Sequence, residues 1–134
     1  MSTIVAVDLE TTGLDPNRDE IIEIGAVRMK DGRIEDEWST LVNPGRSIPK
    51  EITQLTNITN NMVAGAPPIA GVIEELIAFI GNETIVGHNV GFDLAFLRNQ
   101  GAAEDNLAAD TYELAAVLLP TSSRYNLGAL CIEH

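Results

Sequence analysis

The stretch that most constrains the fold covers residues 4–14 and reads IVAVDLETTGL. Its first four residues are apolar on both faces of an extended chain and rich in β-branched side chains, which is typical of a strand in the middle of a sheet. Two acids, Asp8 and Glu10, then end the strand. Residues two apart in a strand point to the same side, so we expect these carboxylates to share a face, with Cα atoms roughly 6.5 Å apart.

Two carboxylates this close in a partly buried site repel each other, and each raises the pKa of the other. A hard divalent cation such as Mg²⁺ or Mn²⁺ removes the repulsion, because such ions take carboxylate oxygens as ligands. The alternative is that Asp8 and Glu10 are solvated side chains at a strand end. The apolar strand before them favours a metal site, since open α/β sheets bind ligands at the carboxyl ends of their strands.

The rest of the chain alternates between strand and helix patterns. Further strands are expected at 21–29 and 34–42, with an Asp31-Gly32 hairpin, and at 84–87 and 107–110. Helices are expected at 49–55, 60–63, 69–80 (ending at Gly81), 90–99 (with Asn89 as N-cap), 111–119 and 126–133. A three-strand antiparallel meander followed by parallel strands predicts an α/β fold with a mixed sheet and flanking helices.

A second unusual stretch reads VGHNVGFDLAFL. Phe92 and Phe96 lie at helical spacing and predict a buried helix. Asp93 stands between them in the first turn, where the helix dipole alone favours a carboxylate. The functional interpretation is that Asp93 faces the end of the first strand and joins Asp8 and Glu10, so that three carboxylates hold one metal tightly and a second loosely.

Two other polar residues near these motifs have simpler explanations. His88 is expected to be a packed residue at a strand end, which is the usual fate of a lone histidine. Asp110 is placed to cap the next helix, with Glu113 three residues later as in a capping box. The alternative for His88 is that it belongs to a loop that lines a site, since it stands between a strand and a helix. Asp110 is not expected to bind the metal.

Composition limits the remaining possibilities. The 134 residues suffice for one domain, which we expect to span 1–134. The net charge of −12 is unusual for a simple nucleic-acid binder, although acids can hold cations. A single cysteine, Cys131, excludes an internal disulfide framework and fits a reducing, cytoplasmic location. The apolar runs are too short for a membrane span.

The motifs DLETTGL and HNVGFD resemble the first two motifs of the DEDD-type 3′-5′ exonucleases, which include RNase T and the DnaQ-like epsilon proofreading subunits. The segments IIEIGAV, LVNP and ADTYEL extend the resemblance over nearly the whole chain. It implies a ribonuclease H-like fold. The segments PKEITQLTNIT and LLPTSSRYNLGAL resemble the exonuclease domains of DinG-type helicases and of the polymerase PolC, so a helicase or polymerase domain is expected in the parent chain.

The resemblance also implies a mechanism. Two Mg²⁺ or Mn²⁺ ions, held by Asp8, Glu10 and Asp93 about 3.5–4 Å apart, clamp the terminal phosphodiester at the 3′ end of single-stranded DNA or RNA. Hydrolysis then releases nucleoside monophosphates.

Four further residues acquire roles from the same resemblance. Thr11 and Thr12 are expected to line the terminal nucleotide, and Leu14 to wedge against bases. Phe92 is expected at the nucleotide pocket.

The family also requires a general-base histidine and, a few residues later, a fourth metal-binding aspartate. We expect both beyond His134, on a last helix that this chain lacks, so the 134-residue chain is expected to have weak or no activity. The alternative is a non-catalytic nucleic-acid- or protein-binding module of the same fold. Another α/β phosphotransferase is disfavoured because no GxxxxGK[ST] phosphate loop occurs.

Overall fold

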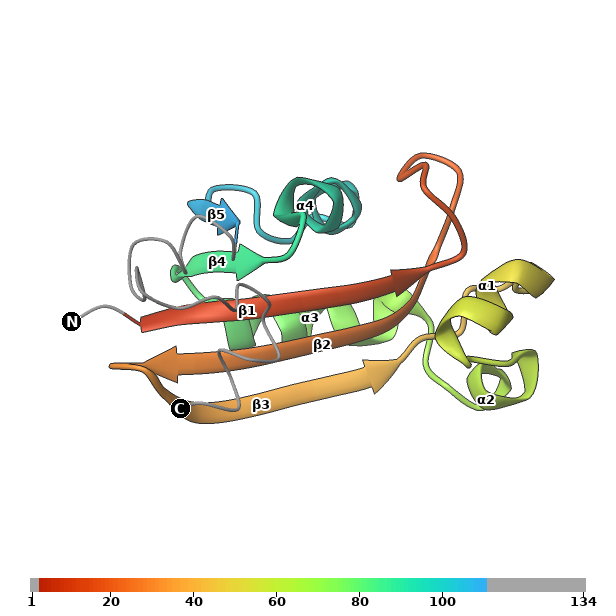
Figure 1. The fold of residues 1–134 in the computed structure, drawn as a ribbon, viewed down its shortest axis with the longest axis horizontal. Helices are drawn as coiled ribbons and strands as arrows, with labels where there is room; N and C mark the ends of the chain where they lie inside the picture. The colour runs from red at the N-terminus through yellow and green to blue at the C-terminus, as the bar shows by residue number, and fades with distance from the viewer. Residues whose placement is uncertain (1–2, 111–134) are drawn as a thin grey trace.

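The computed structural model describes residues 3–110, and Figure 1 shows them as a five-stranded sheet with helices behind it and at one end. The strands are β1 (Thr3–Thr11), β2 (Ile21–Lys30), β3 (Arg33–Leu41), β4 (Thr84–Gly87) and β5 (Ala108–Asp110). The helices are α1 (Lys50–Thr56), α2 (Asn60–Ala64), α3 (Ile69–Ile80) and α4 (Val90–Asn99). The helices expected at 111–119 and 126–133 lie outside the described residues.

The sheet has the strand order β3-β2-β1-β4-β5. β1 is the central strand, as its apolar character predicts; it pairs antiparallel with β2 and parallel with β4. The β2–β3 pair is antiparallel and the β4–β5 pair parallel. The mixed sheet with a three-strand meander is therefore confirmed.

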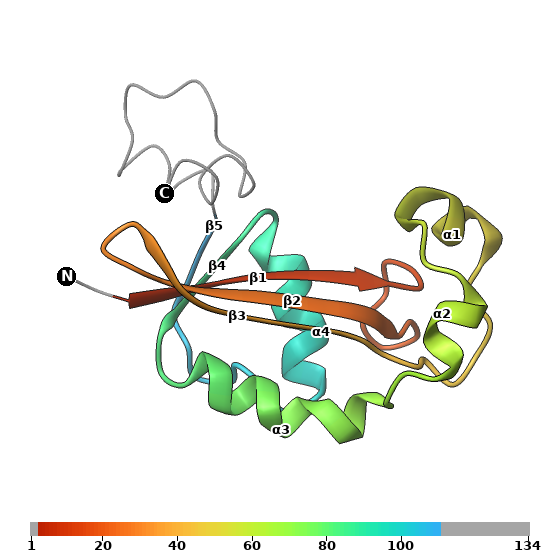
Figure 2. The same ribbon diagram turned by 90° about the horizontal axis from the view of Figure 1, so that it is seen from below.

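The main core lies on one face of the sheet. Figure 2 shows α3 on this face, while α4 crosses the level of the sheet and extends toward α3. Successive side chains of β1 point to opposite faces of the sheet. Val7 and Leu9 point into this core and are buried, whereas Asp8 between them points to the other face and is exposed. The buried partners on the helices are Val72, Leu76 and Ile80 of α3 and Val90, Leu94, Phe96 and Leu97 of α4.

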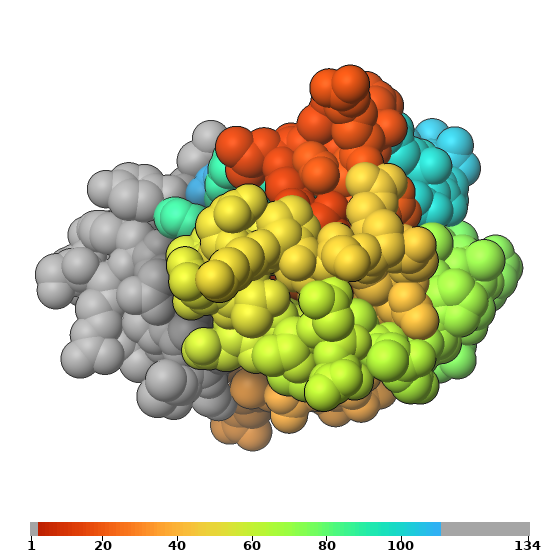
Figure 3. Space-filling view, turned by 90° about the vertical axis from the view of Figure 1, so that its right-hand side faces the viewer, coloured from red at the N-terminus to blue at the C-terminus, as the bar shows by residue number. Residues whose placement is uncertain are grey.

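A smaller core closes the end of the sheet where β1 terminates. It consists of Ile22, Ile48, Ile58 and Val63, with Leu41 and Ile52 packed against it. Figure 3 looks onto this end and shows α1 and α2 (yellow to yellow-green) forming its surface beneath the β1–β2 loop (red-orange). This loop, residues 12–20, follows directly from the acids of β1.

The short length of β4 places α4 beside β1. β4 pairs with β1 only at Ile4–Ala6, and α4 begins three residues after β4 ends. Beyond Ala6, the beginning of α4 therefore lies beside β1 where a longer strand would continue, and Figure 1 shows α4 nearly end-on at this position. Gly87 permits this close approach, because a Cβ there would lie 3.0 Å from the carbonyl oxygen of Val7.

Two of the expected turns are observed, and one expected helix cap is not. Gly81 ends α3 with a positive φ of 58°, and Asp31 and Gly32 form the hairpin with φ of 53° and 78°. Asn89 precedes α4 in a left-handed conformation, but its side chain makes no capping hydrogen bond. The backbone N–H of Val90 instead donates to Oδ2 of Asp110, 3.3 Å away.

Asp110 therefore serves α4, the helix before it in sequence. Its expected role as cap of a helix from Thr111 falls outside the described residues. Within residues 3–110, no helix is long and apolar enough to cross a membrane.

Candidate metal centre

The two acids of β1 lie on the face of the sheet opposite α3. Asp8 is paired with Gly25 and Glu10 with Glu23 across the antiparallel ladder. Their buried neighbours Val7 and Leu9 point into the core on the other side, so the expectation that both carboxylates share a face is confirmed.

Asp93 completes a group of three acids at the junction of β1 and α4. It lies in the first turn of α4 and is only 5% exposed. Burial, followed by the charges of Asp8 and Glu10, raises the pKa of Asp93 to about 8. The charges of the β1 acids reach Asp93 although more than eighty residues separate the two motifs, so the fold brings the two motifs together.

The acids of β1 are perturbed in the same direction. Burial raises the pKa of Asp8, an effect that the neighbouring His88 partly offsets. Burial also raises the pKa of Glu10, and the charges of Asp8 and Glu23 add to it. No Lys or Arg within residues 3–110 forms an ion pair with Asp8, Glu10 or Asp93. Among the described residues, the group therefore concentrates negative charge without an ion pair to Lys or Arg, and His88 acts only on Asp8.

The three carboxylates are ligands that a hard cation prefers, but their side chains do not converge on one point. Within the described part of the chain, no three His, Cys, Asp or Glu side chains are grouped so that they could hold a metal ion as they stand. Carboxylates without a counter-ion repel one another, which favours separated side chains and a protonated Asp93. An all-oxygen donor set fits Mg²⁺ or Mn²⁺, and binding would require the side chains to close on the ion and Asp93 to lose its proton.

Two residues near the acids were not assigned to the site by sequence reasoning. His88 is exposed, not packed, and its charge lowers the pKa of Asp8. Ala6 pairs with Val86 in the parallel β1–β4 ladder. Asp8 and His88 each follow two residues later on their own segments, so they are neighbours. Glu23 faces Glu10 across the β1–β2 ladder. A correct strand register would have identified both.

The expected substrate residues differ in accessibility. Thr11 and Thr12 are both buried. The hydroxyl of Thr11 donates to the carbonyl of Gly13 at 2.6 Å, and that of Thr12 donates to Asp19 at 3.2 Å and accepts from the N–H of Glu20 at 2.9 Å. Both hydroxyls are therefore used by the loop itself, and these residues can reach a nucleotide only through other atoms.

The other two expected substrate residues are more open. Leu14 is 84% exposed on the β1–β2 loop. Phe92 is half-buried in the first turn of α4, and its ring centroid lies 5.0 Å from that of Phe96. Leu14 is thus free to contact a ligand, whereas Phe92 presents one part of its ring and packs the remainder against the core.

A shallow cavity of about 300 Å³ borders the metal centre on the open face of the sheet. It is lined by Ala6, Asp8, Gly25, Ala26, Val27, Glu37, Trp38 and Ser39. Its lining includes Asp8 but neither Glu10 nor Asp93, so the cavity reaches the three acids only at Asp8.

Comparisons with known proteins agree with this geometry. The RNase_T family, described as exonuclease, matches residues 5–133. The chain is 44% identical over 127 residues to the PolC-type DNA polymerase III of Clostridium perfringens, covering 92% of this chain and 9% of that protein. It is 39% identical over 130 residues to the DNA polymerase III subunit epsilon of Aquifex aeolicus, covering 93% of this chain and 64% of that protein.

Among solved structures, exonuclease X in complex with 5′-overhanging duplex DNA matches with a TM-score of 0.71 and 34% identity, over 95% of this chain and 70% of that one. The chain spans about a tenth of the length of its PolC-type relative. The matched motifs, the sheet order and the structural likeness agree, and the chain belongs to the exonuclease family of DEDD type, with its ribonuclease H-like fold.

Proposed function

We propose that this chain is a metal-dependent 3′-5′ exonuclease domain that removes nucleoside monophosphates from the 3′ end of single-stranded DNA. The observation that carries the proposal is the group formed by Asp8, Glu10 and Asp93 at the junction of β1 and α4. The charge of Asp8 raises the pKa of Glu10, and the charges of both raise the pKa of the buried Asp93. The choice of DNA is supported by the DNA polymerase relatives and by exonuclease X, which is bound to DNA in its structure.

In this proposal the three carboxylates hold Mg²⁺ or Mn²⁺. Bound cations supply Lewis-acid stabilisation of the charge that develops on the phosphate. Asp93 gives up its proton when the cation binds, and its burial keeps water from competing for its oxygens. Two ions are proposed for the complete site.

The substrate would lie across the end of β1. Leu14 stands exposed on the loop that follows the acids, and Phe92 lies one residue before Asp93. We propose that these two apolar side chains contact the terminal nucleotide, and that the Thr11 and Thr12 backbone shapes its pocket. No general base is assigned among residues 3–110, and the one expected beyond His134 falls outside the described residues.

The relatives also support a setting for this domain. The PolC-type polymerase contains a matching segment within a much longer chain, so we propose a replicative polymerase as the parent context, with a cytoplasmic location. Single-domain organisation over 1–134 is likewise proposed.

The test combines metal binding, substrate binding and turnover. Mn²⁺ is titrated while the melting temperature is measured, for the wild type, Asp93→Asn and the exposed control Asp105→Asn. Binding of 5′-fluorescein-labelled single-stranded DNA is compared with that of a circular DNA of the same sequence, which has no 3′ end. Digestion of the linear DNA in Mn²⁺ is followed on a sequencing gel.

We expect Mn²⁺ to stabilise the wild type and Asp105→Asn but not Asp93→Asn. Linear DNA should bind more tightly than circular DNA, and any products should shorten from the 3′ end. Equal stabilisation of Asp93→Asn by Mn²⁺ would refute the metal centre. Equal binding of linear and circular DNA would instead indicate a non-catalytic nucleic-acid-binding module.

A further inference from the structure

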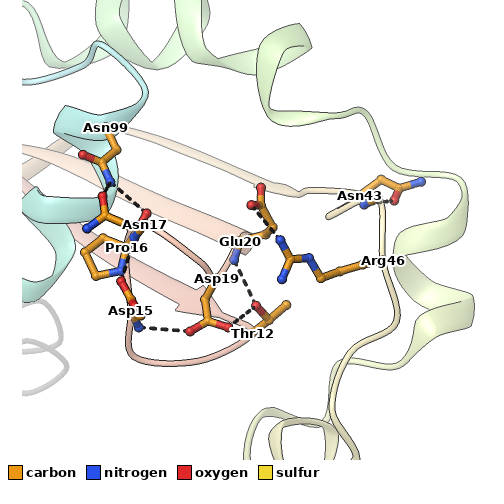
Figure 4. A network of polar contacts seen from close by, with 10 residues as sticks. Thr12, Asp15, Pro16, Asn17, Asp19, Glu20, Asn43, Arg46 and Asn99 are labelled. Atoms are coloured by element: carbon orange, nitrogen blue, oxygen red, sulfur yellow. Dashed lines mark hydrogen bonds and ion pairs between the residues drawn. The ribbon is translucent and has the colours of Figure 1, made fainter.

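The β1–β2 loop is organised around one carboxylate, that of Asp19. Its Oδ1 accepts the hydroxyl of Thr12 at 3.2 Å, and its Oδ2 accepts the backbone N–H of Asp15 at 3.0 Å. The backbone N–H of Asp19 also donates to the carbonyl of Asp15 at 2.7 Å. Figure 4 shows the carboxylate lying between the two sides of the loop. One side chain thus joins the beginning of the loop to its middle.

Gly13 makes room for this carboxylate. A Cβ at position 13 would lie 2.4 Å from Oδ2 of Asp19, closer than atoms can approach. Gly13 does not have a positive φ, so the requirement for glycine comes from the packing of Asp19 and not from the backbone conformation. The residues on both sides of Leu14, namely Gly13 and Asp15, therefore contact the same carboxylate.

The loop is also joined to the helix that carries Asp93. Near the end of α4, the side-chain amide of Asn99 donates to the carbonyl of Pro16 at 2.8 Å and to Oδ1 of Asn17 at 3.2 Å. Figure 4 shows Asn99 reaching from α4 to this part of the loop. The loop and α4 are thereby held in one relative position, although they meet across about eighty residues of sequence.

Holding Leu14 in place contributes little hydrophobic burial to folding, because the residue is 84% exposed. Surface loops are normally mobile, and ordering one costs conformational entropy. Holding an exposed apolar residue in a fixed place is useful when that residue contacts a ligand, since a preorganised contact avoids the ordering cost on binding.

We propose that Asp19 is a positioning residue for the 3′-terminal nucleotide: its carboxylate, packed against Gly13, holds Leu14 in place on the loop that follows the acids of β1. The inference rests on the proposed exonuclease function. Asp19 itself touches neither the metal nor the nucleotide in this account; it acts through Leu14.

A double-mutant cycle tests this role. Binding of 5′-fluorescein-labelled single-stranded DNA, with a phosphorothioate at its 3′-terminal linkage to slow hydrolysis, is measured in Mn²⁺ for the wild type, Asp19→Ala, Leu14→Ala and the double variant. We expect each single variant to weaken binding about tenfold, which corresponds to about 1.4 kcal/mol. The double variant should be no weaker than either single one, because Asp19 acts only through Leu14.

Two controls distinguish a positioning role of Asp19 from an effect of its charge on DNA binding and from an effect on protein stability. Removing a negative charge from a protein of net charge −12 should by itself favour DNA binding, so the matched variant Asp105→Ala should bind equally or slightly more tightly. A purely structural role for Asp19 would lower the melting temperature of Asp19→Ala and leave the DNA affinity of the folded protein unchanged. The stabilisation by Mn²⁺ should persist in Asp19→Ala, because the three metal-binding acids are intact.

Gly13→Ala provides an independent test, because it displaces the Asp19 carboxylate without removing its charge and should weaken DNA binding to a similar degree. Unchanged affinity in both Asp19→Ala and Gly13→Ala, or fully additive losses in the cycle with Leu14→Ala, would overturn the inference. If the wild type itself fails to prefer linear over circular DNA, the proposed function fails, and that outcome is distinct from any result on Asp19.

Discussion

Replacing Asp93 with asparagine should stabilise the metal-free protein at neutral pH and abolish its stabilisation by Mn²⁺. Asp93 is 5% exposed, and burial together with the charges of Asp8 and Glu10 raises the pKa of its carboxyl to about 8. Asparagine has nearly the shape of a protonated aspartate but has no proton to lose. The substitution therefore removes a pH-dependent penalty while preserving the packing of α4.

The size of the effect follows from proton linkage. In the unfolded chain the pKa of Asp93 returns to its ordinary value of 3.8, so between about pH 4 and about pH 8 the unfolded chain has lost a proton that the folded protein retains. Stability therefore falls as the pH rises through this window, by about 1.4 kcal/mol per pH unit, and is constant with respect to this group above about pH 8. At pH 7 the penalty is at most about 4 kcal/mol.

The penalty is measurable by thermal unfolding. For a chain of this length about 1 kcal/mol shifts the melting temperature by about 3–4 °C, so Asp93→Asn should melt up to about 10–15 °C higher at pH 7 in EDTA. The difference should shrink toward about pH 4, and Asp105→Asn should follow the wild type at every pH. Adding Mn²⁺ should raise the melting temperature of the wild type only. Parallel pH profiles for wild type and Asp93→Asn in EDTA would refute the reasoning.

Three further predictions concern the metal and the scaffold. The affinity for Mn²⁺, measured by calorimetry, should rise with pH and level off above about pH 8, because the ion must displace the proton of Asp93. Gly87→Ala should cost about 1–3 kcal/mol in urea unfolding, because the new Cβ meets β1 at 3.0 Å; Gly91→Ala, which meets no atom within 4 Å, should be neutral or stabilising. Leu76→Ala, in the centre of the core, should cost about 2–5 kcal/mol, whereas Ile77→Ala on the exposed side of the same helix should cost much less.

Most of the fold could be predicted from local pattern. The apolar character of β1 on both faces placed it at the centre of the sheet, and the period-two rule placed Asp8 and Glu10 on one face. The helical spacing at 69–80 and the glycine after it gave the bounds of α3. These features depend on neighbours in sequence, so the sequence displays them directly.

The approach of Asp93 to β1 could not be derived in this way. It depends on β4 being short enough for α4 to lie beside β1, a long-range property that the family resemblance anticipated and local pattern did not. From local pattern alone, the helix dipole explained Asp93 equally well.

Side-chain contacts within and between loops could also not be predicted from local sequence pattern. No local pattern indicated that the Asp19 carboxylate would accept a hydrogen bond from Thr12 and pack against Gly13. The cap of α4 shows the same limit, since Asp110 is contributed by a neighbouring strand twenty residues later.

The central claim is that the acids of β1 and α4 close on one metal site. The most direct test is a crystal grown with Mn²⁺ and measured at a wavelength where manganese scatters anomalously. The account predicts an anomalous peak within bonding distance of carboxylate oxygens from Asp8, Glu10 and Asp93. Well-ordered crystals of the folded protein in which manganese is bound elsewhere, or in which Asp93 stays away from the ion, would contradict it.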